Sequence, residues 1–232
     1  MIPRYEFKIP CALTLRPEIE AWVRLHPAHW RASYPPRQVN NIYFDSPDLQ
    51  DLNTNLGGVG RREKLRLRWY GPELTCVAGA QLELKCKDGL AGWKEIAFFT
   101  GTLDLTGPTW PELLAALREG LEPRARLWLD KRAAPALINA YRRAYYETHD
   151  GVLRLTLDTR LRAYDQRFSL VPNLSRPALL SEQLVIELKG SVEDDSARRL
   201  SQVLLSLPMR VERYSKYLHG MLAAPDLERI VT

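Results

Sequence analysis

Basic side chains occupy alternate positions in the stretch REKLRLRWYG at residues 62–71. In a β-strand, Lys64, Arg66 and Arg68 would share one face and the intervening apolar side chains the other, because successive side chains point to opposite sides of a sheet. Ammonium and guanidinium groups gathered on one face can bind anions, and the planar arginine fork matches the spacing of phosphate oxygens. A single strand with this pattern more often has its charges in water, so one strand alone does not indicate a site.

The same alternation of charged and apolar residues recurs in four other strand-like segments. Their charged or polar faces comprise Arg4, Glu6 and Lys8; Glu83, Lys85 and Lys87; Arg154, Thr156 and Asp158; and Glu187 with Lys189. If these faces all met bulk water, the amphipathic helices would have to pack inside a closed sheet, which fits poorly with short loops. We therefore expect the apolar strand faces to point outward beneath the helices and the charges to line the interior.

A mainly basic interior determines the chemistry that we expect. Unit charges about 4 Å apart interact by roughly 4 kcal/mol at an effective dielectric constant of 20, so such a lining is costly when it is empty. A barrel of about eight strands leaves room inside only for side chains or one slim ligand. The pattern therefore favours a narrow anion of high charge density, such as a chain of phosphates, with Arg66 and Arg68 as donors to phosphate oxygens.

Eight segments have the alternation of a strand, which predicts a mainly β fold. They are residues 4–9, 40–45, 63–71, 81–87, 93–99, 139–147, 152–158 and 183–190. Turn-forming residues separate several of them, which indicates hairpins and an antiparallel sheet. Four amphipathic helices are predicted at residues 14–25, 109–121, 194–207 and 213–222. We expect an α+β fold, mainly β: a closed antiparallel barrel of about eight strands with the helices packed outside.

Length and composition are those of a soluble globular chain of 232 residues, for which we expect a single domain over residues 1–232. The formal net charge of +5 suggests an anionic partner without identifying it. Three cysteines without paired short spacings predict neither a disulfide framework nor a zinc site, and they fit a reducing, cytoplasmic setting. No apolar run approaches the roughly 20 residues that span a bilayer, so we expect no membrane segment.

Two other motifs have weaker claims to a function. GGVG at residues 57–60 lacks the Gly-Lys-Ser/Thr sequence of a P-loop and is better explained as a turn into the next strand. HPAH at residues 26–29 has two histidines at helical spacing, but Pro27 lies between them and no third ligand is near in the sequence. We therefore expect neither a P-loop nor a histidine metal site.

The order of several short motifs resembles the VTC domain. These motifs are RYEFK, NIYFDSPDLQDL, KLRLRWYG, LELKCK followed by WKE, YRRAYY, RLTLD, VIELKG and RYSKY, and they span nearly the whole chain. The VTC domain is the catalytic polyphosphate polymerase domain of the vacuolar transporter chaperone complex and of bacterial relatives. It belongs to the triphosphate tunnel metalloenzymes, the CYTH-like superfamily, so the resemblance implies a barrel that holds a triphosphate inside.

The resemblance also implies roles for individual residues. Those with catalytic roles would be Arg66, Arg68, Arg143, Lys189 and Lys216. Those that bind phosphate would be Lys8, Lys85, Lys94, Tyr141, Arg154, Arg213 and Ser215, to which the charge pattern adds Lys64. Arg213 stands where the family often has a lysine. Glu187, and with less support Glu6, would bind Mn²⁺ or Mg²⁺.

The implied reaction is transfer of the γ-phosphoryl group of ATP to the end of a growing polyphosphate chain. A phosphate oxygen is already anionic at neutral pH, so alignment and charge neutralisation would carry the catalysis without a side-chain base. Triphosphatases of the superfamily begin with a Glu-x-Glu-x-Lys strand, whereas this chain has Arg4 at the first position. This departure favours the polymerase over hydrolysis.

Two other functions stay open at this point. The first is metal-dependent hydrolysis of inorganic or organic triphosphate, and the second is binding of polyphosphate without turnover. Nucleic-acid binding is less favoured, because the basic residues alternate with aliphatic ones and no aromatic stacking platform accompanies them. Eukaryotic relatives work inside membrane complexes, so any membrane-protein partner would be a separate chain.

Overall fold

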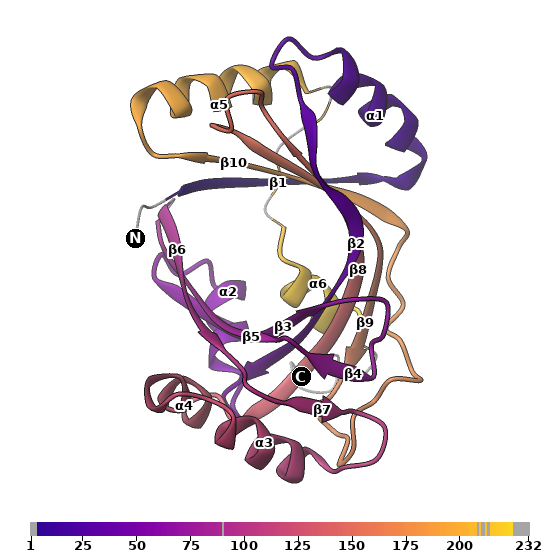
Figure 1. Cartoon of the computed structure of the whole chain (residues 1–232), viewed down its shortest axis with the longest axis vertical. Helices are drawn as coiled ribbons and strands as arrows, with labels where there is room; N and C mark the ends of the chain where they lie inside the picture. The colour runs from indigo at the N-terminus through magenta and orange to yellow at the C-terminus, as the bar shows by residue number, and fades with distance from the viewer. Residues whose placement is uncertain (1–3, 90, 208, 210–211, 213, 225–232) are drawn as a thin grey trace.

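The computed structural model describes residues 4–89, 91–207, 209, 212 and 214–224, and within them eight strands form a closed antiparallel barrel (Figure 1). The barrel strands are β1 (Arg4–Ala12), β2 (Arg31–Asp45), β3 (Arg62–Tyr70), β5 (Gln81–Asp88), β6 (Ala91–Phe98), β8 (Ala134–Glu147), β9 (Arg154–Asp165) and β10 (Gln183–Ser191). Their order is β1-β10-β9-β8-β2-β3-β5-β6, and Arg4 of β1 pairs with Gly92 of β6 where the barrel closes. The predicted fold class is confirmed.

The structure also contains elements that the sequence patterns do not predict. Strand β2 begins at Arg31, well before the predicted start at residue 40, and the short strands β4 (Cys76–Ala78) and β7 (Thr102–Asp104) form a separate pair. Helices α2 (Gln50–Leu56) and α4 (Pro123–Asp130) lie outside the predicted set. Both are short, and α2 begins after Leu49, whose backbone is left-handed, so neither has the long apolar period that predicts a helix.

The four predicted helices correspond to α1 (Arg16–Leu25), α3 (Trp110–Glu119), α5 (Asp194–Ser206) and α6 (Lys216–Leu222). A 3-10 helix, Leu13–Leu15, leads into α1. In Figure 1, α1 and α5 lie beside β1 and β10, and α3 and α4 lie on the opposite side of the barrel. Within the part of the chain that the structure describes, no helix combines the length and apolar character needed to cross a membrane.

The outward strand faces form apolar cores beneath the helices. Ile9 of β1 and Ile186 of β10 share one buried cluster with Leu200 of α5. On the other side, Leu67 of β3 packs in a cluster that includes Leu117 of α3. These side chains alternate with the charged ones along the same strands, so the predicted outward direction of the apolar faces is confirmed.

Helix α6 packs at one end of the barrel against residues of its inner face. The Tyr217 ring stacks on Tyr43 of β2 with centroids 5.0 Å apart, and its hydroxyl donates to Asp45 Oδ2 at 2.6 Å. Gly220 lies so close to β8 that an added Cβ would come within 2.6 Å of Leu137 Cδ2. This close contact brings the first turn of α6 next to the charged side chains of the barrel.

Replacing Gly220 by valine should therefore destabilise the protein by about 1–3 kcal/mol, because the new side chain overpacks a buried contact. The gain in helix propensity, below about 1 kcal/mol, is smaller. Urea unfolding measures the change, and Gly107→Val is the control, since a Cβ at Gly107 meets no atom within 4 Å. A Gly220→Val variant as stable as the wild type would contradict this packing of α6.

Candidate functional site

The inner face of the barrel gathers the charged side chains that alternate along its strands. Among the described residues, nine cations and four carboxylates form one group, which leaves a formal excess of five positive charges. The cations are Lys8, Lys64, Arg66, Arg68, Lys85, Lys94, Arg143, Lys189 and Lys216, and the carboxylates are Glu6, Glu83, Asp158 and Glu187. We call this group the interior charge network.

Glu83 of β5 is the counter-ion of the arginines on β3. Arg66 Nη2 lies 2.6 Å from Glu83 Oε2, and Lys94 Nζ lies 2.6 Å from Oε1. Arg68 Nη1 is 3.7 Å from Oε2, while its Nη2 donates to the Tyr141 hydroxyl at 3.2 Å. Burial raises the pKa of Glu83, but the charges of the two arginines and the lysine outweigh burial, so its pKa lies below the ordinary value.

Glu6 of β1 is shared by three lysines. Lys85 Nζ lies 2.8 Å from both carboxylate oxygens, Lys8 Nζ lies 2.9 Å from Oε1, and Lys189 Nζ lies 4.0 Å from Oε2. Burial lowers the pKa of Lys85 to about 7; Glu6 opposes this shift and Lys8 adds to it. Since one carboxylate serves three ammonium groups, this part of the network keeps a net positive charge.

Arg143 of β8 bridges two buried carboxylates. Its guanidinium donates to the two oxygens of Asp158 at 2.6 and 2.7 Å and to Glu187 Oε2 at 2.6 Å. Lys216 of α6 lies 2.6 Å from Asp158 Oδ2, and Lys189 lies 2.8 Å from Glu187 Oε1. Burial raises the pKa of Glu187, but Lys189 and Arg143 outweigh it and hold the pKa well below the ordinary value.

Lys64 of β3 has no carboxylate partner among the described residues. Its Nζ donates to the hydroxyl of Ser215, the residue that caps α6, at 2.7 Å. Burial, followed by the charges of Lys8 and Lys85, lowers the pKa of Lys64 well below its ordinary value. The empty interior is therefore costly at this lysine, and an anion beside it would restore the charge balance.

Several cations lie closer to solvent than the carboxylates that neutralise them. The side chains of Lys85 and Lys189 are each 30% exposed and that of Lys94 is 42% exposed, whereas Glu83 and Glu187 are 1% and 6% exposed. The carboxylates thus lie beneath the ammonium groups, which solvent can reach. An anion entering the interior would meet positive charge first.

The structure brings together most of the side chains predicted for the site. The network contains Arg66, Arg68, Arg143, Lys189, Lys216, Lys8, Lys64, Lys85, Lys94, Glu187 and Glu6, with Tyr141 and Ser215 as neutral hydrogen-bond partners. Arg154 is exposed at the start of β9 and makes no ion pair within the described ranges, and Arg213 lies outside them. Six of the chain's eight lysines belong to the network, so lysine is concentrated at this site.

Sequence reasoning placed Glu83 and Asp158 on charged faces without identifying them as counter-ions. The register between strands gives each carboxylate its partner. Glu83 lies opposite Arg66 on β3, and Asp158 lies opposite Arg143 on β8. Strand alternation predicts the face of each residue but not its cross-strand partner. Two of the four carboxylates of the network, Glu83 and Asp158, were therefore not predicted as site residues.

Aromatic rings gather around Arg37, a basic residue outside the alternating set that the sequence analysis describes. The rings of Tyr34, Tyr70 and Tyr145 surround the Arg37 guanidinium, with their centroids 5.6, 3.9 and 5.0 Å from its Cζ atom. These rings come from β2, β3 and β8, so they are far apart in the sequence and only the pairing of the strands unites them. We call these four residues the tyrosine cluster.

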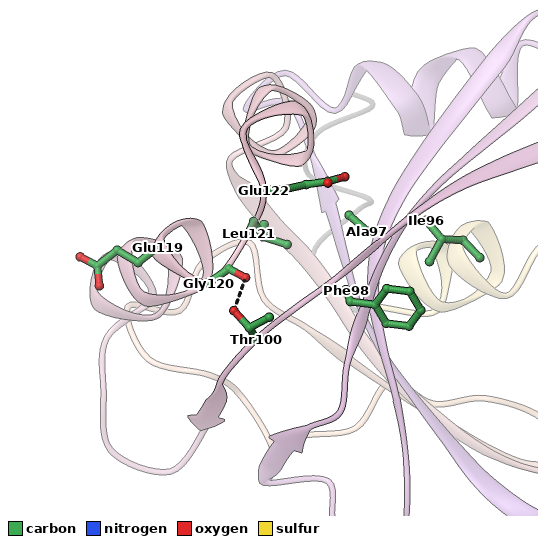
Figure 2. Close-up of a pocket in the computed structure, with 8 residues that line it drawn as sticks. All are labelled: Ile96, Ala97, Phe98, Thr100, Glu119, Gly120, Leu121 and Glu122. Atoms are coloured by element: carbon green, nitrogen blue, oxygen red, sulfur yellow. Dashed lines mark hydrogen bonds between the residues drawn. The ribbon is translucent and has the colours of Figure 1, made fainter.

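Two surface cavities have a different lining. One, of about 390 Å³, lies between the end of β6 and the turn from α3 to α4; in Figure 2 the Thr100 hydroxyl donates to the Gly120 carbonyl there, at 3.1 Å. The other, of about 670 Å³, lies between α1 and α5, where Arg199 is paired with Asp150. Among the residues that line them, neither presents an unpaired Lys or Arg, so neither suits a polyanion.

Glu6 and Glu187 are the carboxylates predicted to bind a metal. Both approach the Lys189 ammonium, at 4.0 and 2.8 Å, so they share one cationic neighbour. Mg²⁺ commonly takes one or two carboxylates and completes its coordination with substrate phosphates and water. Within the described ranges, no group of three or more His, Cys, Asp or Glu side chains is suited to a metal, so phosphate would have to supply further ligands.

One solved structure shares this fold. A putative adenylyl cyclase from Hippeastrum, described as having a dominant triphosphatase activity, is 15% identical, with a TM-score of 0.53 and 97% of each chain covered. A protein from Pyrococcus horikoshii is 16% identical, with a TM-score of 0.47 and coverage of 94% of this chain and 98% of the other. The comparison with curated proteins finds no significant match. The VTC domain family matches residues 11–224, and the chain is therefore a member of that family.

Proposed function

We propose that the protein is an ATP-dependent polyphosphate polymerase, which transfers the γ-phosphoryl group of ATP to a growing polyphosphate chain in the barrel interior. The observation that carries this proposal is the excess of five positive charges in the interior charge network. Polyphosphate carries negative charge on every phosphate, so a few consecutive phosphates would neutralise this excess. Membership of the VTC domain family supports the same function.

The state of the interior carboxylates supports phosphate, rather than water, as the acceptor. Water must give a proton to a base when it attacks. Burial raises the pKa of Glu6 and of Asp158, but in each case the neighbouring cations outweigh it and lower the pKa, as they do for Glu83 and Glu187. These carboxylates are therefore poor bases. A terminal phosphate oxygen is already anionic and needs none.

The chain's own residues would bind and align the two phosphate ends. Arg66 and Arg68 offer guanidinium forks from one strand, and Lys85 and Lys189 offer ammonium groups from two others. The chain-end oxygen would attack the γ-phosphorus in line, the bond to the β-phosphate oxygen would break, and ADP would leave with that electron pair. Lys216 would neutralise charge at the end of the barrel where α6 packs.

A divalent metal would bind at Glu187 and Glu6. Mn²⁺ or Mg²⁺ held there would neutralise further charge on the phosphoryl oxygens when bound. The Lys189 ammonium lies near both carboxylates; it is the main charge that lowers the pKa of Glu187, whereas Lys8 and Lys85 are the main charges that lower the pKa of Glu6. The site then combines protein cations with one exchangeable cation.

Hydrolysis of triphosphates is the second candidate function. The Hippeastrum protein, which has a similar fold, is described as having a dominant triphosphatase activity. Against this function, Arg4 replaces the first glutamate of the triphosphatase strand and is exposed at the start of β1. Binding of polyphosphate without turnover is the third candidate, and the retention of Glu187 beside the lysines favours chemistry over binding alone.

Incubation of the protein with ATP and Mn²⁺, with and without a short polyphosphate primer, should release ADP while long phosphate chains appear and orthophosphate stays low. Products are separated by size, and ADP and orthophosphate are quantified. Lys216→Met should slow the transfer about 10- to 150-fold, because a charge-assisted contact of roughly 1.5–3 kcal/mol is lost. Lys131→Met is the control, because Lys131 is an exposed lysine at the end of helix α4.

Two results of this assay would reject the polymerase. Orthophosphate equal to ADP, without any chain, would assign the protein to the triphosphatases. Polyphosphate binding with no ADP formed under any metal condition would leave a binding module.

Lys64→Met should make the empty protein more stable and its affinity for tripolyphosphate lower. In the folded state the pKa of Lys64 lies well below that of an unfolded lysine, and each unit of this difference corresponds to about 1.4 kcal/mol. Because the unfolded chain then holds more protons, wild-type stability should rise as the pH increases toward about 10.4, the pKa of an unfolded lysine. Urea unfolding at several pH values measures the rise, and calorimetry measures the affinity.

In the Lys64→Met variant, this rise in stability with pH should be smaller and the affinity about tenfold lower. Lys131→Met again controls for the loss of one surface lysine. A Lys64→Met variant that is less stable and binds tripolyphosphate as well as the wild type would show that Lys64 is a structural residue.

A further inference from the structure

The tyrosine cluster, Tyr34, Arg37, Tyr70 and Tyr145, has the composition of a stacking site. The Arg37 guanidinium lies 3.9 Å from the Tyr70 ring centroid and donates from Nε to the Tyr145 hydroxyl at 3.2 Å. Tyr34 and Tyr145 meet edge to face with centroids 5.7 Å apart. Several contacts therefore hold the guanidinium and three rings in a fixed arrangement before any ligand is present.

The cluster keeps both charge and surface for a ligand. Arg37 has no carboxylate partner within the described residues, so its positive charge is not neutralised. Tyr34 and Tyr70 are 58% and 38% exposed, although both rings already contact Arg37. Part of each ring is therefore still open to a ligand. A flat aromatic group could stack there beside an uncompensated cation.

The cluster adjoins the interior charge network beside Arg143, whose partner Asp158 also binds Lys216 of α6. Arg37 of β2 lies opposite Arg143 of β8 in the strand register, and the Arg143 guanidinium lies 6.0 Å from the Tyr145 ring centroid. A ligand with a flat ring at one end and phosphates at the other could therefore contact the rings and the network together.

We infer that the tyrosine cluster is the subsite for the base of the nucleoside triphosphate whose phosphates bind in the interior charge network. This inference rests on the proposed function, since it takes ATP as the phosphoryl donor. The base would stack on the exposed tyrosine rings, and Arg37 would attract the first phosphates that follow the ribose.

The chemistry of the cluster sets its selectivity. Tyrosine rings and a guanidinium recognise a flat π-system by stacking, which is tolerant of the base because every base has a π-face. The larger surface of a purine favours it over a pyrimidine. ATP and GTP should therefore bind with similar affinity. Both should bind more tightly than inorganic tripolyphosphate, because tripolyphosphate has no base to stack on the tyrosine rings.

Calorimetric titration of the whole chain with the β,γ-imido analogue of ATP, its GTP counterpart and inorganic tripolyphosphate tests this subsite. Tyr34→Leu combined with Tyr70→Leu should weaken both nucleotide analogues about 5- to 10-fold and tripolyphosphate less than about 2-fold. Phe168→Leu, at an aromatic residue that is 67% exposed elsewhere, controls for the loss of surface aromatic area.

Each contrary result has a distinct meaning. Equal weakening of all three ligands would overturn the subsite, because the rings would then only support the phosphate site, and so would unchanged nucleotide affinity in the double variant. If the wild type failed to bind tripolyphosphate, the proposed function would fail separately. In that case, nucleotide affinity independent of Tyr34 and Tyr70 would overturn the subsite as well.

Discussion

The structure depends on holding more positive than negative charge inside a closed sheet. Like charges about 4 Å apart repel by roughly 4 kcal/mol at an effective dielectric constant of 20, so the folded chain must separate, neutralise or hydrate its interior cations. The buried carboxylates Glu83 and Glu187 neutralise several of these cations, while the ammonium groups of Lys85 and Lys189 stay in contact with solvent. The remaining excess of positive charge raises the free energy of the empty folded state, and a bound polyanion would lower it.

The apolar cores outside the barrel hold this charge in place. Outward leucines and isoleucines on the same strands pack beneath α1, α3, α4 and α5, which fixes the direction of every alternate side chain. At one end, Tyr217 and Gly220 pack α6 closely against the barrel, and this packing places Lys216 beside Asp158. Stability therefore comes from the outer layer, and the interior is free to be arranged for binding.

The alternation of charged and apolar residues predicted the eight barrel strands and the inward direction of their charges. A repeat of two residues identifies a strand and also assigns each side chain to one of its two faces. It could not predict α2, which is short and begins after a left-handed Leu49. Nor could it distinguish Arg143, which is bound by Asp158 across the neighbouring strand, from Arg154, which is exposed at a strand end. Such partners depend on strand register, and so does the assembly of Arg37 with three tyrosines from three strands.

The most direct test of the central claim is acylation of lysines in the presence and absence of polyphosphate, with each site read by mass spectrometry. If the interior charge network binds the anion, Lys64, Lys85, Lys94 and Lys189 should react more slowly when polyphosphate is bound. The exposed Lys131 should react at an unchanged rate, which serves as an internal control. Equal reactivity of the network lysines with and without bound polyphosphate, or protection of Lys131 instead, would contradict binding in the barrel interior.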